Sequence, residues 1–308
     1  MIQRFIKAAF RKKKINPFAE MDLNKSINEY KIVHEPVFIS GNGRSGTHFM
    51  AKVLEQHEQF HSMHHDDIPD TIADVYTWFS TWYGIPISPN GFLKSRAHLI
   101  EQAGNLGKKY VESNAILCLN VHQLLAAFGG KLIIMVRHPK NVTESHFHKG
   151  WYKKVDYNNA LPVPGYNFYH DRSSHFFSRI MPKNEQEFDA WKNYTRMGKC
   201  AWKWRICYEE LFKQIEQYQL QDKVRFVYLN NFDYTAYLSL CEWIGIANVM
   251  PEVTYNQIVN DKPGKGKVKP DTHQWSSEEK RDFNLEIQKV IDKFQMIEDR
   301  QKWIFKDI

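Results

Sequence analysis

From residue 36 onward, short apolar runs alternate with stretches of helical periodicity. Three runs have the length and apolar content of strands: Pro36–Ser40, Lys131–Val136 and Val224–Leu229. The second run lies between paired glycines and a His-Pro pair, which is typical of a buried parallel strand. Helices are expected over Thr47–Gln56 and near 187–217, 233–244 and 276–298. This alternation predicts an α/β fold, a single domain with a central parallel sheet flanked by helices.

The first residues of the chain have a different pattern. Apolar side chains between Ile2 and Phe10 fall on one helix face, and basic residues lie beside and after them as far as Lys14. Two interpretations stay open: a basic amphipathic helix that lies on an anionic membrane, and a terminal helix that packs on its own domain. We therefore expect an N-terminal extension over residues 1–30 and one domain over residues 31–308.

Composition narrows the class of protein. The chain has 308 residues, and its 42 Lys and Arg against 35 Asp and Glu give a net charge of +7, which indicates an anionic partner. The four cysteines form no C-x-x-C pair, so buried reduced thiols are expected. The sequence lacks both a long apolar span and a signal-peptide core. These features predict a cytoplasmic protein, with or without peripheral membrane contact through residues 2–14.

The segment from Phe38 to Met50 carries the clearest chemical signal. A buried strand leads into a turn with three glycines, Gly41, Gly43 and Gly46, and a helix follows. Such a turn directs backbone N–H groups and the positive end of the helix dipole toward one point, which makes an anion site. We call residues 41–47 the glycine loop.

The glycine loop differs from a nucleotide triphosphatase loop, whose pattern is G-x-x-x-x-G-K-[ST]. Gly41 and Gly46 have the right separation, but Thr47 stands in the Lys position and His48 in the position of the Mg²⁺-binding hydroxyl. The basic residue lies inside the loop as Arg44. This arrangement favours a phosphate loop that works without a metal.

The run Gly43-Arg-Ser-Gly-Thr47 resembles the 5′-phosphosulfate loop of sulfotransferases that use 3′-phosphoadenosine-5′-phosphosulfate (PAPS). The resemblance implies the P-loop-like sulfotransferase fold, PAPS as cofactor, 3′-phosphoadenosine-5′-phosphate as product, and no metal. His48 replaces a second Thr of the family pattern. The implied cofactor-binding residues here are Gly43, Arg44, Ser45, Gly46, Thr47 and His48.

A second segment, residues 131–149, resembles the family's 3′-phosphate motif. Arg137 ends a buried strand and Ser145 follows eight residues later, with His138 in place of the usual Asp. Lys149 lies one helical turn beyond Ser145. Weaker matches place Tyr228 at an adenosine contact and a basic loop over the cofactor, formed by Lys265, Gly266 and Lys267.

The catalytic base is expected after the second strand, in the run from His57 to Pro69. In tyrosylprotein sulfotransferases a Glu lies at about this distance from the loop Arg, and the same offset from Arg44 falls on His65. His64 is nearly as good a candidate, because strand alternation turns only one of the two inward. A histidine accepts a proton near neutrality, and Arg44 suits the charge on the leaving oxygen. A metal site that includes His61 and Asp66, or a plain polar loop, are the alternatives.

Two features depart from the family pattern. Ser113 stands near a position where related enzymes carry a Lys, and the aromatic-rich stretch 147–182 reads as an irregular insertion beside an active site. We expect transfer of a sulfuryl group to a hydroxyl or amine on a carbohydrate, glycolipid or small molecule. A small-molecule kinase and a non-catalytic module that binds an anionic glycan or membrane are the alternatives; a nucleic-acid partner is not expected.

Overall fold

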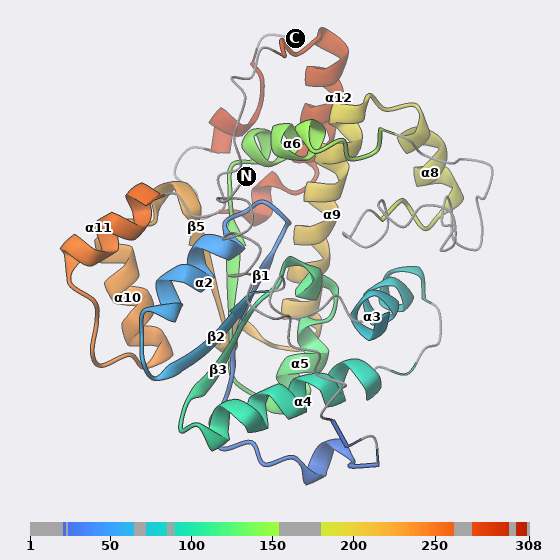
Figure 1. Cartoon of the computed structure of the whole chain (residues 1–308). Helices are drawn as coiled ribbons and strands as arrows, with labels where there is room; N and C mark the ends of the chain where they lie inside the picture. Colours follow the sequence, from blue (N-terminus) through green and yellow to red (C-terminus); the bar gives the residue numbers. More distant parts are fainter. Residues whose placement is uncertain are drawn as a thin grey trace, which may run out of the picture.

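The computed structural model describes residues 21–22, 24–64, 72–84, 88, 90–153, 180–261, 273–295 and 300–306 (Figure 1). A central sheet of five parallel strands runs through this part of the chain, in the order β2-β3-β1-β4-β5. The strands are β1 (Val37–Gly41), β2 (Phe60–His64), β3 (Lys109–Ser113), β4 (Lys131–Val136) and β5 (Val224–Tyr228).

The strand order places β1 between β3 and β4. The chain crosses from β1 toward β2 and β3 on one side, and β4 leads to β5 on the other. The loops that follow β1 and β4 therefore diverge from a single point at the carboxyl edge of the sheet. Such a reversal of strand order is where open α/β sheets bind ligands.

Helices cover both faces of the sheet because its strands are apolar on both sides. In β4, Leu132 and Ile134 face one layer of helices while Ile133 and Met135 face the other. One layer contains α2 (Thr47–Glu55), α10 (Tyr234–Ile244) and α11 (Glu252–Asp261). The other contains α4 (Asn90–Asn105), α5 (Val121–Phe128), α9 (Arg196–Gln217) and α12 (Ser277–Gln288).

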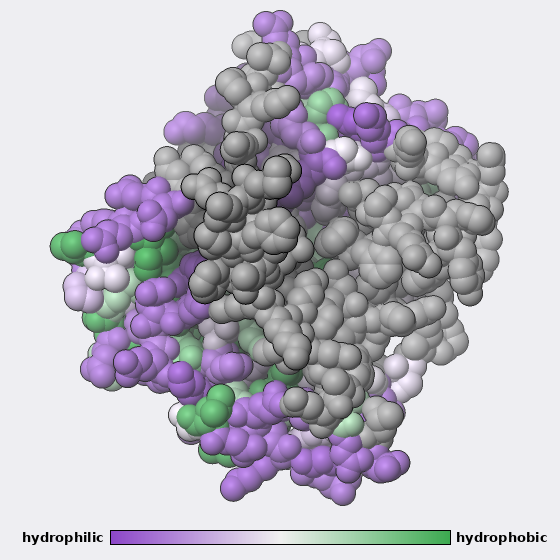
Figure 2. All heavy atoms as spheres, viewed as in Figure 1, coloured by the Kyte–Doolittle hydropathy of each residue, from purple (hydrophilic) through white to green (hydrophobic). Residues whose placement is uncertain are grey.

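Shorter elements complete the described chain. They are η1 (Ile27–Glu29), α3 (Ile72–Tyr83), η2 (Ala115–Leu119), α6 (Pro139–His148), α8 (Glu185–Lys192), η3 (Gln221–Lys223), η4 (Leu229–Asn231), η5 (Ile291–Lys293) and η6 (Arg300–Trp303). None of the helices in these ranges is both long enough and apolar enough to cross a bilayer. In Figure 2 the described surface is mostly hydrophilic, with small hydrophobic patches near α10 and α11.

The predicted α/β fold is confirmed, and the three expected strands are present within one residue of their predicted ends. Two long helices were predicted wrongly. The helix expected over 187–217 is divided into α8 and α9, because the hydroxyl of Thr195 accepts the Gly198 N–H and starts a new helix. The helix expected over 276–298 ends at Gln288. Residues 1–20 of the N-terminal extension lie outside the described residues, so the amphipathic helix expected there stays a prediction.

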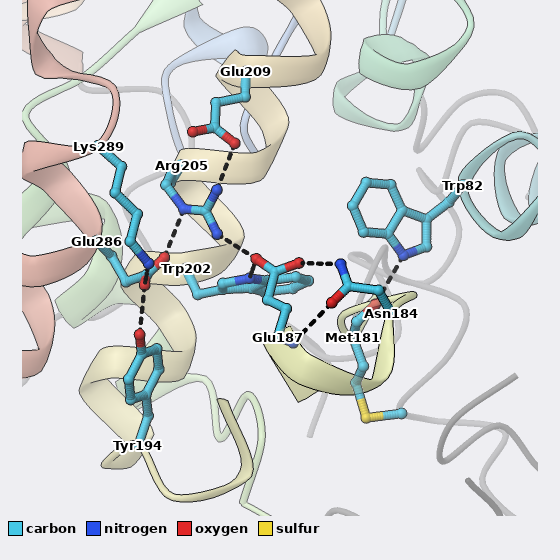
Figure 3. Close-up of polar contacts among 10 residues, drawn as sticks. All are labelled: Trp82, Met181, Asn184, Glu187, Tyr194, Trp202, Arg205, Glu209, Glu286 and Lys289. Carbon is cyan, nitrogen blue, oxygen red and sulfur yellow. Dashed lines mark hydrogen bonds and ion pairs between the residues drawn. The ribbon is translucent and has the colours of Figure 1, made fainter. Parts of the chain in front are cut away.

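Helix α9 is joined to its neighbours by one buried arginine. Arg205 pairs with Glu187 of α8 and Glu286 of α12 at 2.6 Å each, and with Glu209 of its own helix. Figure 3 shows this network, in which Trp202 and Tyr194 donate further hydrogen bonds to the carboxylates. Because the buried Arg205 is paired with three carboxylates, we assign it a structural role.

Candidate anion site at the ends of strands β1 and β4

Glycine is required at both ends of the glycine loop. Gly41 has a φ of +142°, and a Cβ there would lie 2.4 Å from the Met135 carbonyl oxygen of β4. Gly46 has a φ of +104°, and a Cβ there would lie 2.8 Å from the Leu229 side chain. L-residues rarely adopt such angles, and backbone this close to its neighbours leaves no room for a side chain. The glycines predicted from the sequence therefore have a packing reason as well as a conformational one.

The loop turns tightly into α2 between these glycines. The N–H of Ser45 donates to the Asn42 carbonyl at 3.1 Å, and the Ser45 hydroxyl donates to the same oxygen. No side chain of the described residues caps the N-terminus of α2. Thr47 is buried at the first position of the helix, so the N-terminus of α2 lies directly at the end of the loop.

Arg44 and Arg137 come together at this point from different strands. Arg44 has a φ of +74° inside the loop, and its Nε donates to the Ser145 hydroxyl of α6 at 2.9 Å. Arg137 follows β4, and its guanidinium donates to the Arg44 carbonyl at 3.2 Å. The structure thus brings together three residues that the sequence assigned to two different phosphate positions.

The guanidiniums of Arg44 and Arg137 are half-buried. Burial lowers the pKa of Arg44, and burial together with the charge of Arg44 lowers the pKa of Arg137. Across the described ranges, no carboxylate forms an ion pair with either arginine. Glu144 opposes the lowered pKa of Arg137, but its carboxylate accepts the Trp275 indole N–H at 2.9 Å. Such a pair of like charges is stabilised by an anion, and the planar donors match phosphate or sulfate oxygens.

His138, which stands in place of an Asp of the family pattern, caps the helix that follows it. Its Nδ1 accepts the Lys140 N–H at 3.2 Å, which caps α6, and its Nε2 faces the Lys302 carbonyl at 3.0 Å. These contacts fit the neutral ring with its proton on Nε2. Burial lowers the pKa of His138, in agreement with a neutral ring.

His146 supports the loop from the side of α6, a role that the sequence did not suggest. Its Nε2 lies 3.0 Å from the Gly43 carbonyl oxygen. Its ring stacks on Trp151 with a centroid distance of 3.8 Å and an angle of 3° between the planes. The only sequence signal was its place next to Ser145, which does not reveal a contact 103 residues away.

His64 lies beside the start of the loop helix. It ends β2, its side chain is 8% exposed, and its ring meets that of His48 edge-on at 4.6 Å. His48 is the second residue of α2, so the expected base is next to the glycine loop. His65 and Asp66 lie outside the described residues.

Ser113 does not replace the cation expected near its position. Its buried hydroxyl donates to the Thr47 carbonyl at 2.7 Å and thereby supports the start of α2. Among the described residues, no group of three or more His, Cys, Asp and Glu is arranged to hold a metal ion. The alternative metal site included His65 and Asp66, so it is not covered by this finding.

The remaining predicted residues lie around the same edge. Tyr228 pairs with Val136 in the sheet, one residue before Arg137, and burial raises its pKa to about 12. Lys149 is exposed and caps the C-terminus of α6. The residues Lys265, Gly266 and Lys267 lie outside the described ranges. After that segment the chain returns to α6, where the Trp275 indole meets Glu144.

Solved structures similar to this chain are sulfotransferases. The sulfotransferase STF9 from Mycobacterium avium matches with a TM-score of 0.53 and 12% identity, over 87% of this chain and 78% of that one. A sulfotransferase from Alicyclobacillus acidocaldarius matches 88% of this chain and 99% of that one with 14% identity, but its TM-score of 0.45 is too low to carry weight. No protein-family model and no curated protein matches the sequence. The chain therefore has the sulfotransferase fold, as the glycine loop had suggested.

Proposed function

We propose that the protein is a PAPS-dependent sulfotransferase. The observation that carries this proposal is the pair of half-buried arginines, Arg44 and Arg137, which meet at an uncapped helix N-terminus without carboxylate partners in the described chain. The fold supports the same reaction class. A phosphate loop without the Walker Lys argues against the alternative of a small-molecule kinase.

The residues present fit such a nucleotide. The donors at this edge are N–H groups, two guanidiniums and the Ser145 hydroxyl, the set that phosphate oxygens require. Asn42 supports the fit, because its amide is fully buried in the loop and has no hydrogen-bond partner among the described residues. We assign residues 43–48 to the 5′-phosphosulfate, Arg137 and Ser145 to the 3′-phosphate, and Tyr228 to the adenosine. Lys149, Lys265, Gly266 and Lys267 complete this assignment from the sequence.

PAPS supplies an activated sulfuryl group and leaves as 3′-phosphoadenosine-5′-phosphate. Arg44 is placed to stabilise negative charge on the leaving oxygen, since its positive charge already lies at the loop. His64 is our choice for the base that takes the proton of the acceptor hydroxyl or amine. Its side chain is nearly buried, its ring lies against that of His48, and a histidine ring can act as a general base.

A matched pair of variants tests the base. Replacing His64 with Gln should lower kcat by about 10²-fold or more and leave the affinity for the product nucleotide unchanged. Replacing His61 with Gln is the control, because His61 lies on the same strand three residues earlier and points to the opposite face. If the His64→Gln and His61→Gln variants have the same activity, His64 is not the base, and the assignment moves to His65.

Nucleotide binding without a metal tests the donor. The product nucleotide should stabilise the protein in EDTA, and ATP should stabilise it no better when Mg²⁺ is added. Stabilisation by ATP only with Mg²⁺ would favour the kinase instead. Nucleotide binding without transfer of labelled sulfate to a panel of sugars, glycolipids and small hydroxyl compounds would favour the non-catalytic module.

The acceptor, the cytoplasmic location and the membrane contact stay predictions. A carbohydrate, glycolipid or small-molecule acceptor agrees with the range of the resembled family, and no nucleic acid is needed to account for the positive charge. Deleting residues 2–14 should release the protein from anionic vesicles if this segment is a membrane anchor. Equal binding of both forms would mean that the segment packs on its own domain.

A further inference from the structure

Two cysteines and a lysine form a buried cluster away from the anion site. Cys118 of η2 and Cys207 of α9 have their sulfur atoms 3.6 Å apart, although 89 residues separate them in the sequence. Lys203 lies one turn before Cys207, and its ammonium donates to the Cys207 sulfur at 2.5 Å. The two cysteines are fully buried and Lys203 is 1% exposed. All four cysteines of the chain are buried and unbridged.

The buried ammonium identifies the charged sulfur. A buried charge needs a counter-charge, and no carboxylate pairs with Lys203 within the described ranges. The groups that face it are the Cys207 sulfur and, with its centroid 5.6 Å away, the Trp78 ring of α3. We therefore assign the thiolate to Cys207, whose sulfur accepts from Lys203, and this assignment makes Cys118 the thiol of the pair.

The proton affinities of the two sulfurs agree with this assignment. Burial and the nearby Glu210 raise the pKa of Cys207, but the hydrogen bond from Cys118 and the charge of Lys203 outweigh them and lower this pKa to about 6. The pKa of Cys118 is raised well above its ordinary value by its hydrogen bond to Cys207 and by burial. A thiolate that accepts a hydrogen bond from a second thiol is the nucleophile that disulfide chemistry requires.

We propose that Cys118 and Cys207 are a redox-active pair that a peroxide converts to a disulfide. The Cys207 thiolate attacks one oxygen of hydrogen peroxide, the O–O bond breaks, and a sulfenic acid and hydroxide form. The Cys118 sulfur then attacks the Cys207 sulfur and displaces a second hydroxide. The protons of Cys118 and of the solvent convert both hydroxides to water. Two thiols lose two electrons, and one peroxide gains them.

Formation of the disulfide requires a movement of the two sulfur atoms. The two sulfurs have to approach from 3.6 Å to about 2.05 Å, the length of a disulfide bond. The cross-link would join η2, which follows β3, to α9, where Tyr208 donates its hydroxyl to the Met135 carbonyl at 2.7 Å. Helix α9 thereby contacts Met135, the same residue that Gly41 of the glycine loop approaches. The oxidised protein should melt at a higher temperature because the bond closes a long loop of the unfolded chain.

Oxidation of the full chain tests the proposal. The reduced protein is treated with hydrogen peroxide, unfolded, alkylated and weighed by mass spectrometry. We expect the loss of two alkylatable thiols, a peptide that joins Cys118 to Cys207, and recovery of both thiols with dithiothreitol. Cys241→Ser is the matched control and should form the same cross-link. Oxidation that reaches Cys200 or Cys241 as fast as Cys207, or that leaves all four thiols alkylatable, would overturn the proposal.

The pH dependence of the oxidation rate tests the role of Lys203 as a positioning residue. In Lys203→Met the Cys207 thiolate loses its counter-charge, so the midpoint of the pH–rate curve should move to higher pH. Cys118→Ser should trap a sulfenic acid at Cys207 and also move the midpoint upward, since serine donates a weaker bond to sulfur. This second variant decides the question if Lys203→Met does not fold. A wild-type midpoint in a folded Lys203→Met protein would contradict the thiolate assignment.

Discussion

Replacing Arg137 with Met removes the guanidinium at the end of β4 and keeps an unbranched side chain. In the wild-type protein this group donates one hydrogen bond to the Arg44 carbonyl at 3.2 Å and lies near the positive charge of Arg44. The variant therefore loses both a hydrogen bond to the Arg44 carbonyl and the repulsion between two positive charges. The proposed nucleotide site of the variant lacks the charged donor of Arg137. We expect a small effect on the stability of the free protein and a large effect on binding.

The magnitudes follow from these contacts. The lost hydrogen bond costs about 1 kcal/mol of unfolding free energy. The repulsion between the two partly exposed guanidiniums, which lowers the pKa of Arg137, is on the order of 1 kcal/mol. The two nearly cancel, so the unfolding free energy should change by less than about 1 kcal/mol. Binding should weaken by about 2 kcal/mol, or roughly 30-fold.

Thermal denaturation with the product nucleotide measures both quantities. At 100 times its dissociation constant, the nucleotide should stabilise the wild-type protein by about 2.7 kcal/mol. At the same concentration a 30-fold weaker site gains only about 0.9 kcal/mol. Isothermal titration provides the dissociation constants directly.

Arg205→Met is the contrasting variant. It removes the guanidinium that pairs with Glu187, Glu209 and Glu286, and only Glu286 keeps a second ion pair, with Lys289, among the described residues. The change should therefore cost about 3–5 kcal/mol of unfolding free energy. Unchanged nucleotide affinity in Arg137→Met would refute the phosphate assignment. A loss of stability as large as that of Arg205→Met would show that Arg137 is a structural residue.

Three further predictions concern the same molecule. Gly46→Ala should lower the unfolding free energy by about 1–3 kcal/mol and weaken nucleotide binding. The positive φ strains alanine, and its Cβ would collide with the Leu229 side chain. Chemical denaturation measures the first effect and nucleotide titration the second. The His64→Gln variant should show a loss of kcat with an unchanged nucleotide dissociation constant. The unfolding free energy should fall as the pH is lowered from 7.5 to 5.5. Burial lowers the pKa of three histidines below 6.5 in the folded protein, so the unfolded chain binds their protons first. Urea denaturation midpoints should show the fall, and replacing these histidines with Gln should reduce it. These histidines are His57, His122 and His138.

The sequence alone determined the elements and the candidate chemistry where local rules apply. A continuous apolar run is a buried strand wherever it occurs, so β1, β4 and β5 were predicted within one residue. The spacing of Gly41, Arg44 and Gly46 is a property of a short segment, and it predicts a phosphate loop. The prediction fails at Thr195. The helical periodicity continues through this residue, but its hydroxyl caps the start of α9 and so divides the predicted helix in two.

Tertiary structure decided which residues meet. The parallel sheet order brings Arg137 to Arg44 across 93 residues and leaves both without a carboxylate in the described chain, whereas Arg205, equally basic in sequence, receives three. His146 on the Gly43 carbonyl and Cys118 beside Cys207 are contacts of the same kind. The composition gives a net charge of +7 and four cysteines. Burial and partners, which only the folded chain supplies, determine which of those groups bind an anion, which stabilise the fold and which are reactive.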